Sequence, residues 1–528
     1  MEYKKPIRFF EKSGVVNPEV SYYVPLKVVN TDNLDVKTMV DMGRYFSIFA
    51  PRQSGKTTSF RRFCESLEQN NIYITILLSF QDCKSLDVKQ FYNSIETELY
   101  AQLIKRLKDV YCDKLEIVNK FLESQRLTDH LAFKSLFIRL NEIIESKKIV
   151  IFIDEFDGIP SSELENFLCT LRELYQRYKE IKQKALYSVG LVGIRNITKL
   201  VVGGVSPFKI ADRVNLPRFS LKNVEDLYAQ YTEETNQPFT EEAVQKVYEE
   251  TRGQPWLVNR LGTILTVNVK PETLEPIIED DVEKAVKILL KEQNNHFDNL
   301  IEKAKQYKER FVEIVFNGVE YDPDEEEQNL LELHGLISED NDKAIVANNI
   351  YKKRFVKMFF REVSSHVDLT GKRYYLEDGF LNMELVLSEF EKYIARIGVR
   401  AFYEKGRTYE KTGQFLLTAW LYQFIAGTDG DLRYECPTGL GRMDILLTFK
   451  GRKYIIETKI KRYKGILDEA VAQLRDKYLK AERVAEGYVI VFDPDTQAGE
   501  LCVPKSIQIS ESRQIISFNI GIGKIRNE

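Results

Sequence analysis

The segment Tyr45–Thr58 reads YFSIFAPRQSGKTT, an apolar stretch that changes abruptly into a polar loop. Arg44 to Ala50 has the pattern of a short strand, and Ser59 to Glu68 has the periodicity of a helix. A strand, a loop and a helix in this order surround the loop with backbone N–H groups and a helix N-terminus. Lys56 adds a positive charge and Thr57 a hydroxyl. The loop therefore has the chemistry that binds a nucleoside triphosphate, here ATP, with Mg²⁺.

Each loop residue has an expected role. Gly55 lets the backbone approach the phosphates, Lys56 reaches the outer phosphates, and Thr57 binds Mg²⁺. Ala50 stands where the pattern G-x-x-x-x-G-K-[ST] has its first glycine, and its methyl group is tolerable while φ stays negative. The expected nucleotide-binding residues of the loop are Gln53, Ser54, Gly55, Lys56, Thr57 and Thr58.

A second part of the site is expected at the end of a buried strand. Lys148 to Ile153 is almost wholly apolar and is followed by Asp154 and Glu155. Open α/β sheets bind ligands at the C-terminal ends of their strands. We therefore expect Asp154 to hold Mg²⁺ through water and Glu155 to polarise the attacking water as a general base. The alternative is a chance Gly-Lys-Thr beside an unrelated acidic strand end, which the order of the two motifs disfavours.

The remaining pattern up to residue 220 alternates strands and helices, which predicts an α/β core with a mostly parallel sheet. Ser188 and Arg195 are candidates for sensing the γ-phosphate, although a buried serine and a solvated arginine are the more ordinary interpretations. The other expected strands are Ile72 to Phe80, Leu186 to Val192 and Leu200 to Val202, and the expected helices are Val88 to Arg106 and Leu131 to Ser146.

Two smaller regions follow the core. Residues 221–295 predict a helical lid, interrupted at Gly253-Gln254-Pro255-Trp256, from which Arg260 is a candidate for reaching the nucleotide. Residues 296–365 alternate helices and short strands as a winged helix does. Acidic residues repel phosphate, so we expect this module to pack between domains and not to bind DNA. These acidic residues are Asp322, Asp324, Glu325, Glu326 and Glu327.

Residues 375–528 contain a second set of chemically informative residues, after a polar linker at Ser364 to Arg373. Phosphodiester cleavage with a metal ion needs two converging carboxylates and a positive group near the attacking water. Glu457 and Lys459 lie two residues apart on an expected strand and share a face, and Asp444 lies on the neighbouring strand of the hairpin. The expected strands are Leu432 to Glu435, Met443 to Phe449 and Lys453 to Lys459, with a hairpin turn at Lys450-Gly451-Arg452.

We therefore predict a Mg²⁺ site, which Mn²⁺ could also fill, with Asp444, Glu457 and Thr458 as ligands and Lys459 as the catalytic cation. An ion pair at a strand end is the alternative for this pattern. Further candidates are Gln473 and Tyr478 on the following helix (Ile466 to Glu482), Glu410 and Glu435 as additional ligands or solvated acids, and Lys461, Arg462 and Lys464 as contacts to a DNA backbone or a solvated helix entrance.

The bulk composition is that of a globular, multidomain protein. The chain has 528 residues, 43% of them hydrophobic and 30% charged. Lys and Arg number 76 against 80 Asp and Glu, a net charge of -4, so nucleic-acid contacts must be local. The six cysteines form no C-x-x-C pair and the four histidines are far apart, which disfavours zinc and His-based catalysis. Without a secretory or membrane-spanning pattern, we expect a cytoplasmic protein.

With these motifs the chain resembles the prokaryotic AAA-like P-loop ATPases that are fused to a PD-(D/E)XK nuclease-superfamily domain. The resemblance implies an ATPase core with a helical lid and a winged helix, and a restriction-endonuclease-like α/β domain with Asp444, Glu457 and Lys459 as its catalytic set. Met443 replaces the proline of the motif, a variable position that carries no ligand. The matching stretches are Tyr45–Thr58, Ile151–Asp157, Gly253–Asn259, Gly441–Asp444 and Glu457–Lys459.

The expected function is an ATP-regulated, Mg²⁺-dependent DNA nuclease, and the resemblance suggests roles in defence against foreign DNA or in mobile elements. The expected partners are ATP, DNA and further copies of the chain, with no membrane. The alternative is a nucleotide-driven switch or scaffold whose C-terminal domain binds without cutting.

Overall fold

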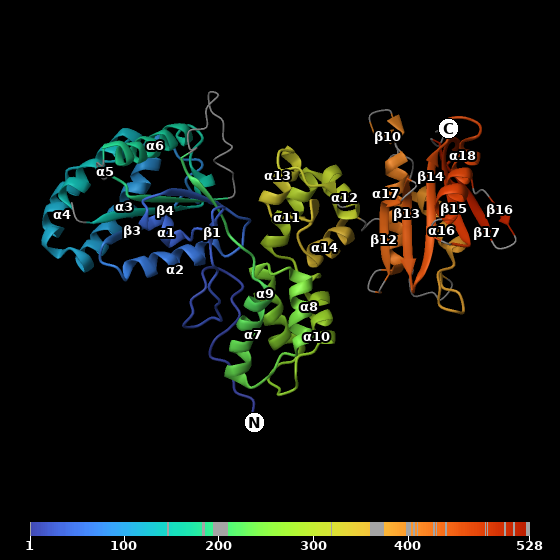
Figure 1. The fold of residues 1–528 in the computed structure, drawn as a ribbon, viewed down its shortest axis with the longest axis horizontal. Coiled ribbons are helices and arrows are strands. Elements are labelled where there is room, and N and C mark those ends of the chain that lie inside the picture. Colours follow the sequence, from blue (N-terminus) through green and yellow to red (C-terminus); the bar gives the residue numbers. More distant parts are fainter. Residues whose placement is uncertain are drawn as a thin grey trace. The chain divides into compact units, whose positions relative to one another are not determined.

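The computed structural model describes two compact units (Figure 1). The first contains residues 1–308, 321–340 and 346–351, and the second contains residues 309–320, 341–345 and 352–528. The described residues are 2–144, 147–181, 185–193, 210–317, 319–359, 374–397, 403–404, 407–408, 410–425, 428, 430–438, 441–480, 482, 484–500, 503–510 and 513–523.

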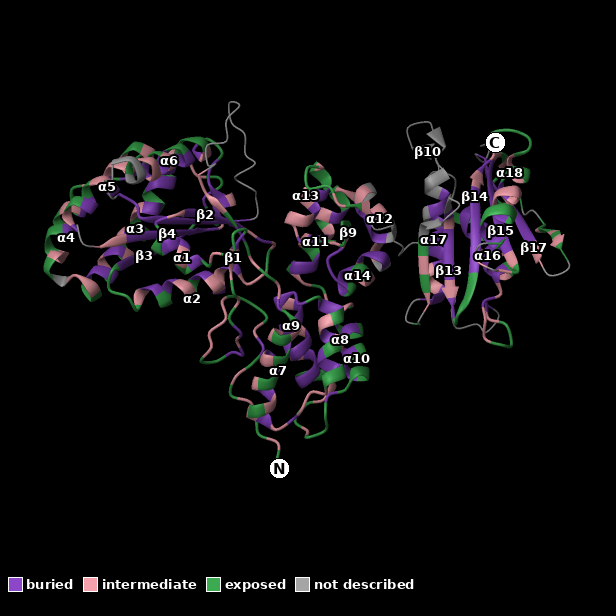
Figure 2. Cartoon of the chain, viewed as in Figure 1, coloured by how far each residue is buried: buried purple, intermediate pink, exposed green. Residues whose placement is uncertain are grey.

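A six-stranded sheet forms the centre of the first unit. Its neighbours pair in parallel from β6 to β3, and only β1 at one edge is antiparallel. The central strands are buried along their length (Figure 2), which explains their nearly continuous apolar sequences. The strand order is β1 (Val29–Asn30), β6 (Asp212–Asn215), β2 (Tyr45–Phe49), β5 (Ser188–Gly193), β4 (Lys148–Asp154) and β3 (Tyr73–Ser79).

Helices cover both faces of this sheet. Phe60 of α2 and Met39 of α1 pack with Phe152 on one face, and Phe91, Phe133 and further apolar side chains pack on the other. The helices of the first face are α1 (Val36–Asp41) and α2 (Lys56–Glu68), and those of the second are α3 (Val88–Val110), α4 (Leu115–Glu123), α5 (His130–Ile143) and α6 (Leu164–Ile181). This is an α/β fold of the P-loop NTPase type, as expected from the sequence.

A set of helices follows the sheet, and most of them begin at a polar N-cap residue. Ser220 caps α7, Thr240 caps α8, and Gln254 caps α9 through a bond from Leu257 N to its side chain. Tyr22 of the N-terminal arm donates to Glu234 of α7 at 2.6 Å. The helices are α7 (Leu221–Thr235), α8 (Glu241–Thr251), α9 (Pro255–Thr263) with a π-helical continuation at Ile264–Val269, α10 (Glu279–Leu289) and α11 (Asn295–Gln306).

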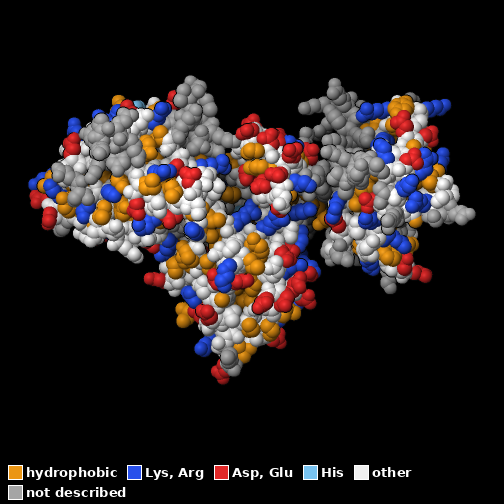
Figure 3. Space-filling view, in the orientation of Figure 1, with side chains coloured by type: hydrophobic (Ala, Val, Ile, Leu, Met, Phe, Trp, Pro, Cys, Tyr) orange, Lys and Arg blue, Asp and Glu red, His pale blue; other side chains and the backbone are white. Residues whose placement is uncertain are grey.

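Residues 308–359 have the order of elements expected for a winged helix, and their segments are divided between the two units. The three-stranded sheet has the order β7 (Val319–Glu320), β9 (Lys343–Val346), β8 (Ile337–Asp340). The helices are α12 (Lys308–Asn317), α13 (Glu326–Leu333) and α14 (Asn349–Phe359). Acidic side chains gather over α13 (Figure 3), as the sequence predicts.

The second unit is built on another six-stranded sheet. β12, β13 and β14 form an antiparallel meander, β15 and β17 continue it in parallel, and β16 closes it antiparallel. The strands, in sheet order, are β12 (Asp431–Thr438), β13 (Gly441–Phe449), β14 (Arg452–Ile460), β15 (Glu486–Gln497), β17 (Arg513–Gly523) and β16 (Lys505–Ser510). The helices are α16 (Met383–Ile397), α17 (Glu410–Ile425) and α18 (Ile466–Gln473), which continues as a π-helix at Leu474–Leu479.

Several elements of the structure were not predicted from the sequence. These are the short strands β1 and β6, the helices α4 and α6, and the strands β16 and β17. The strand expected at residues 200–202, Arg195 and the linker expected at residues 364–373 lie outside the described residues. No helix in the described part of the chain is long and apolar enough to cross a bilayer.

Candidate functional site

The segment at residues 50–58, here called the phosphate loop, follows β2 and runs into the first turn of α2. Two of its residues lie in the left-handed backbone region. Gln53 has φ 58° and Gly55, the residue before α2, has φ 88°. Ala50 is not among the described residues with positive φ, so its methyl group is accommodated without strain. Lys56 is buried, and its Nζ donates to Ala50 O at 2.6 Å and to Pro51 O at 3.0 Å. The Lys56 side chain thus folds back over the loop in which it is expected to bind phosphate.

Thr57 and Asp154 meet at the C-terminal edge of the sheet. Thr57 Oγ1 donates to Asp154 Oδ2 at 2.6 Å, and Asp154 Oδ1 accepts from Glu155 N at 2.9 Å. The Thr57 hydroxyl and the Asp154 carboxylate offer oxygen ligands, which Mg²⁺ prefers as a hard cation, and the N-terminus of α2 beside them suits phosphate. Burial lowers the pKa of Lys56, while the carboxylates of Glu155 and Asp154 act in the opposite direction. The pair fits Mg²⁺, and the lysine beside it suits a bound phosphate.

Segments far apart in the sequence support the loop. Val16 N donates to Thr58 Oγ1 at 3.1 Å, and Gln254 Nε2 donates to Gln53 O at 3.2 Å. Ser54 Oγ is buried and has no hydrogen-bond partner among the described residues. Neither support could be predicted from the sequence, because Val16 contributes only a backbone N–H group and the Gln254 side chain looks like an ordinary helix cap.

Two candidate sensors have other partners. Arg260 forms a double contact with Glu292, with Nε 3.0 Å from Glu292 Oε2 and Nη2 2.5 Å from Oε1. Ser188 Oγ donates to Arg44 O at 2.6 Å and is fully buried, in line with the more ordinary interpretation. Neither contact involves the phosphate loop, so the arrangement gives Arg260 no support as a nucleotide ligand.

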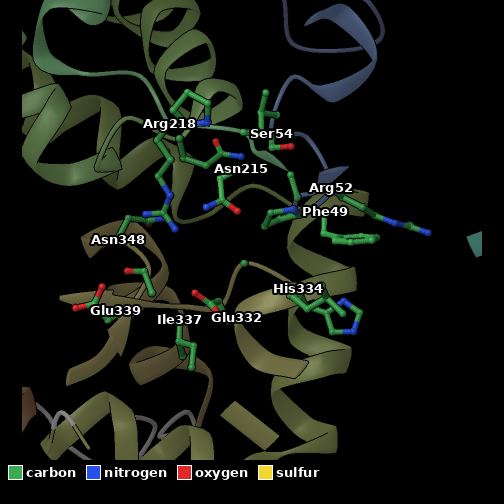
Figure 4. Close-up of a pocket in the computed structure, with 18 of the residues that line it drawn as sticks. Phe49, Arg52, Ser54, Asn215, Arg218, Glu332, His334, Ile337, Glu339 and Asn348 are labelled. Carbon is green, nitrogen blue, oxygen red and sulfur yellow. The ribbon is translucent and has the colours of Figure 1, made fainter. Parts of the chain in front are cut away.

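A cavity of about 520 Å³ adjoins the outer side of the phosphate loop (Figure 4). The loop contributes Ala50, Pro51, Arg52 and Ser54 to its lining. The opposite wall comes from α13 and the following turn, where a Cβ on Gly335 would lie 2.7 Å from Pro51 Cβ. His334 also lines the cavity, and its pKa is lowered by burial and by the charges of Lys303 and Arg52.

The second candidate site lies where β13 and β14 separate. Regular pairing ends at Ile445 and Ile456, and beyond this pair Asp444 Oδ2 accepts from Thr458 N at 2.7 Å and from Thr458 Oγ1 at 2.8 Å. Lys459 Nζ lies 2.6 Å from Glu457 Oε1 and 4.0 Å from Asp444 Oδ2. The two carboxylates and the ammonium group therefore meet around one point.

Gln473 and Tyr478 approach this cluster from the following helix. They are five residues apart and would diverge on an α-helix, but the π-helical turn brings Gln473 Nε2 to 2.9 Å from Tyr478 OH. The pKa of Tyr478 is raised, first by burial and then by the charges of Glu457 and Asp444, and the bond from Gln473 opposes this. The tyrosine hydroxyl is therefore within electrostatic reach of the carboxylates.

The other candidates around the second site are less informative. Lys461 is paired with Asp493 at 2.6 Å, while Arg462 and Lys464 are exposed. The side chains of Glu410 and Glu435 lie outside what the structure describes, although the β12–β13 register places Glu435 opposite Asp444. Within the described side chains, no group of three acidic, His or Cys residues is arranged to hold a metal ion. Asp444 and Glu457 thus offer two ligands to a cation.

Comparison with known proteins gives the N-terminal region a family. Residues 11–357, more than half of the chain, match the AAA-like domain. The chain belongs to the AAA-like domain family. This membership agrees with the P-loop NTPase-type sheet and implies nucleotide binding by the AAA-like region. Residues 381–496 match a domain of unknown function (DUF8371), which supplies no nuclease assignment.

Solved structures of other proteins align with part of this chain at low identity. The Walker-type ATPase PABY2304 of Pyrococcus abyssi is 12% identical, with a TM-score of 0.42 over 63% of this chain and 98% of the other. The RuvB Holliday junction branch migration motor of Thermotoga maritima is 13% identical, with a TM-score of 0.32 over 63% and 92%. Cdc6p of Pyrobaculum aerophilum is 12% identical, with a TM-score of 0.32 over 60% and 88%. No curated protein matches significantly.

Proposed function

We propose that this AAA-like chain binds and hydrolyses ATP with Mg²⁺ at the phosphate loop, and that its C-terminal domain is a Mg²⁺-dependent DNA nuclease. In this proposal the ATPase core, lid and winged-helix module span residues 1–220, 221–295 and 296–365, and the nuclease domain spans 375–528. ATP turnover in the first unit licenses cleavage in the second. The protein acts in the cytoplasm, as a homo-oligomer, in defence against foreign DNA or on mobile elements.

The contact between Thr57 Oγ1 and Asp154 Oδ2 carries the ATPase proposal. It joins the hydroxyl of one motif to the carboxylate of the other across 97 residues of sequence, at the strand edge where α/β sheets bind ligands. When bound, Mg²⁺ neutralises the charge that develops on the β- and γ-phosphates. Lys56 would leave the carbonyls of Ala50 and Pro51 to bind phosphate, and Glu155 would orient the attacking water.

Replacement of the loop lysine tests nucleotide binding. We expect Lys56→Ala to weaken Mg-ATP binding at least about tenfold, because the phosphates lose their nearest positive charge. Arg61→Ala, on the exposed side of α2, is the matched control and should bind as the wild type does. Calorimetric titration of both variants measures this, and equal affinities would reject the phosphate loop as the nucleotide site.

The convergence of Asp444, Glu457 and Lys459 supports the nuclease proposal. Asp444 and Glu457 would hold the cation, with Thr458 as a further ligand, and Lys459 would offset charge developing on the scissile phosphate. The bound metal would polarise the phosphodiester and lower the pKa of a water molecule. Arg462 and Lys464 are exposed beyond the end of β14, and in this proposal they bind the nucleic-acid backbone.

Cleavage of plasmid and linear DNA in Mg²⁺ or Mn²⁺ tests the nuclease. Asp444→Asn and Lys459→Ala should each lower the rate by at least about 100-fold, because each removes a charge from the reacting centre. Lys453→Ala is the matched control, since it breaks a comparable 2.6 Å ion pair, to Glu482, at the other end of β14. Undiminished cleavage by Asp444→Asn would reject the assignment.

One observation favours the alternative function, a nucleotide-driven switch or scaffold that does not cut. Lys459 Nζ lies between the two carboxylates, in the region that a cation would take. If this ion pair is permanent, the C-terminal domain binds nucleic acid or protein without cleavage. The wild-type chain would then cut no nucleic acid in any metal, whereas Lys56→Ala would still change its assembly or binding.

A further inference from the structure

Asn348 lines the cavity beside the phosphate loop (Figure 4) and has a buried side-chain donor without a hydrogen-bond partner among the described residues. We propose that Arg218 and Asn348 bind an oxyanion there, a phosphoryl or carboxylate group. Both residues line the cavity and both belong to the first unit. Neither is among the residues that the sequence motifs single out, so the site goes beyond the proposed ATPase and nuclease chemistry.

Asn348 provides the first donor. Its side-chain Oδ1 accepts from Tyr351 N at 2.8 Å, which makes it the cap of the eleven-residue helix α14. The cap fixes the amide orientation, because the oxygen must face the N–H group of the helix. Asn348 is 1% exposed, and its Nδ2 has no hydrogen-bond partner among the described residues. A buried amide donor at a helix N-terminus is therefore available to an anion.

Arg218 provides a charge next to this amide. Its Nη1 donates to Ala347 O at 2.6 Å, so the guanidinium group lies beside Asn348 (Figure 4). Arg218 forms no ion pair with a carboxylate in the described part of the chain, although the charge of Glu332 acts on it from a greater distance. Burial lowers the pKa of Arg218, because removing the charged guanidinium group from water costs free energy. An oxyanion would compensate that cost and use the planar donors of the guanidinium.

The remaining charged groups of the cavity favour an anion. Arg52 and Arg213 line it in addition to Arg218, against Glu332 and Glu339. Glu332 Oε2 accepts from Tyr321 OH at 2.7 Å, which satisfies part of that carboxylate within the protein. The lowered pKa of His334 leaves this residue neutral near pH 7. Three arginines thus outweigh two carboxylates around the cavity.

The oxyanion has two possible sources. It is either a phosphate of the nucleotide on the adjoining loop or a separate small anion. The first source rests on the proposed ATP site, and the second does not. The experiment therefore measures inorganic phosphate and Mg-ATP separately, on the full chain, by calorimetry.

Asn348→Asp is the decisive variant. Aspartate retains the oxygen that caps α14 but replaces the Nδ2 donor with a negative charge, so the helix should stay folded while anion binding is lost. Asn382→Asp is the matched control, because Asn382 also accepts from a backbone N–H, of Leu385 at 3.2 Å, and does not line the cavity. Arg218→Gln is the second variant, and it decides the matter if thermal melting shows that Asn348→Asp is unfolded.

Phosphate is titrated into Lys56→Ala, in which the loop lysine is absent. If the site binds a separate anion, Lys56→Ala should bind phosphate. Adding Asn348→Asp to Lys56→Ala should lower the phosphate affinity at least about tenfold, whereas adding Asn382→Asp should leave it unchanged. If the site instead binds a phosphate of the nucleotide, Lys56→Ala should not bind inorganic phosphate. The affinity for Mg-ATP should then be at least about tenfold lower in Asn348→Asp and Arg218→Gln than in wild type. Affinities for both ligands within about twofold of the matched parent in every folded cavity variant would overturn the proposal. Wild-type ATP affinity in Lys56→Ala would instead reject the nucleotide site alone.

Discussion

Asp154 and Glu155 are adjacent acids with different surroundings. Asp154 is 5% exposed and is held by Thr57, while Glu155 has φ 50° and turns away from the strand direction. Only one of two consecutive strand residues can face a ligand in regular geometry. The left-handed conformation of Glu155 breaks that alternation, so both carboxylates can serve one bound nucleotide. The difference between them predicts different effects of substitution.

Glu155→Gln should separate ATP binding from hydrolysis. Glutamine has the size of glutamate but cannot accept a proton from the attacking water, so turnover should fall at least about 100-fold. Mg-ATP affinity should stay within about threefold of wild type, because Thr57 and Asp154 are unchanged. Steady-state turnover and calorimetry measure the two quantities. Wild-type turnover in this variant would show that Glu155 is not the general base.

His296 predicts a dependence of stability on pH. It is 7% exposed, its Nε2 lies 2.6 Å from Tyr351 OH, and burial lowers its pKa from 6.5 to about 4. Between these values the unfolded chain binds a proton that the folded chain does not. The contribution of His296 is therefore complete above pH 6.5, falls as the pH decreases, and is lost below about pH 4.

The expected loss is about 3 kcal/mol of unfolding free energy between pH 7 and pH 4. Denaturant unfolding of wild type and His296→Gln measures it as a difference, which removes the titration of all other groups. Glutamine can still bond to Tyr351 and does not titrate. Parallel stability curves for the two proteins would contradict the assignment of this pH dependence to His296.

The turn between α8 and α9 contacts the phosphate loop. Gly253 has φ 69°, and a Cβ at this position would lie 1.9 Å from Phe219 O. The next residue, Gln254, caps α9 and donates to Gln53 O. The glycine is required here both for the backbone conformation and for the close approach, and the turn in this form places Gln254 against the loop.

Gly253→Ala should destabilise the first unit by on the order of 3 kcal/mol and weaken Mg-ATP binding. Gly14→Ala is the matched control, because Gly14 has φ 76° but open space around its Cβ position. It should cost only about 1 kcal/mol, from backbone strain alone. Thermal and denaturant unfolding measure both variants. Equal losses would show that the contact with Phe219 does not matter.

Local patterns predicted the elements that local interactions determine. The strand, loop and helix around Lys56 and the apolar strand before Asp154 lie where the sequence places them. The hairpin turn also lies where the sequence predicts it, and Lys450 and Gly451 both have positive φ. β1 and β6 were missed because strands of two and four residues are too short to show an alternating pattern. The π-helical turn that joins Gln473 to Tyr478 has no periodicity signature of its own.

Across the whole molecule, the two candidate sites belong to different units. Thr57 and Asp154 lie in the first unit, whereas Asp444 and Glu457 lie in the second. The motifs of each site could be predicted because each one is short and has a known chemical purpose. The cavity could not, since Arg218 and Asn348 are 130 residues apart and neither belongs to a motif. Likewise, the partner of Arg260 is 32 residues distant and is visible only in the folded chain.

The most direct test of two separate metal sites is anomalous diffraction from crystals of the full chain with Mn²⁺ and a non-hydrolysable ATP analogue. We predict one Mn²⁺ peak beside Thr57 and Asp154, in contact with the nucleotide phosphates, and a second beside Asp444 and Glu457 with Lys459 displaced. A bound nucleotide away from the phosphate loop, or crystals in which neither pair of residues binds Mn²⁺, would contradict the account.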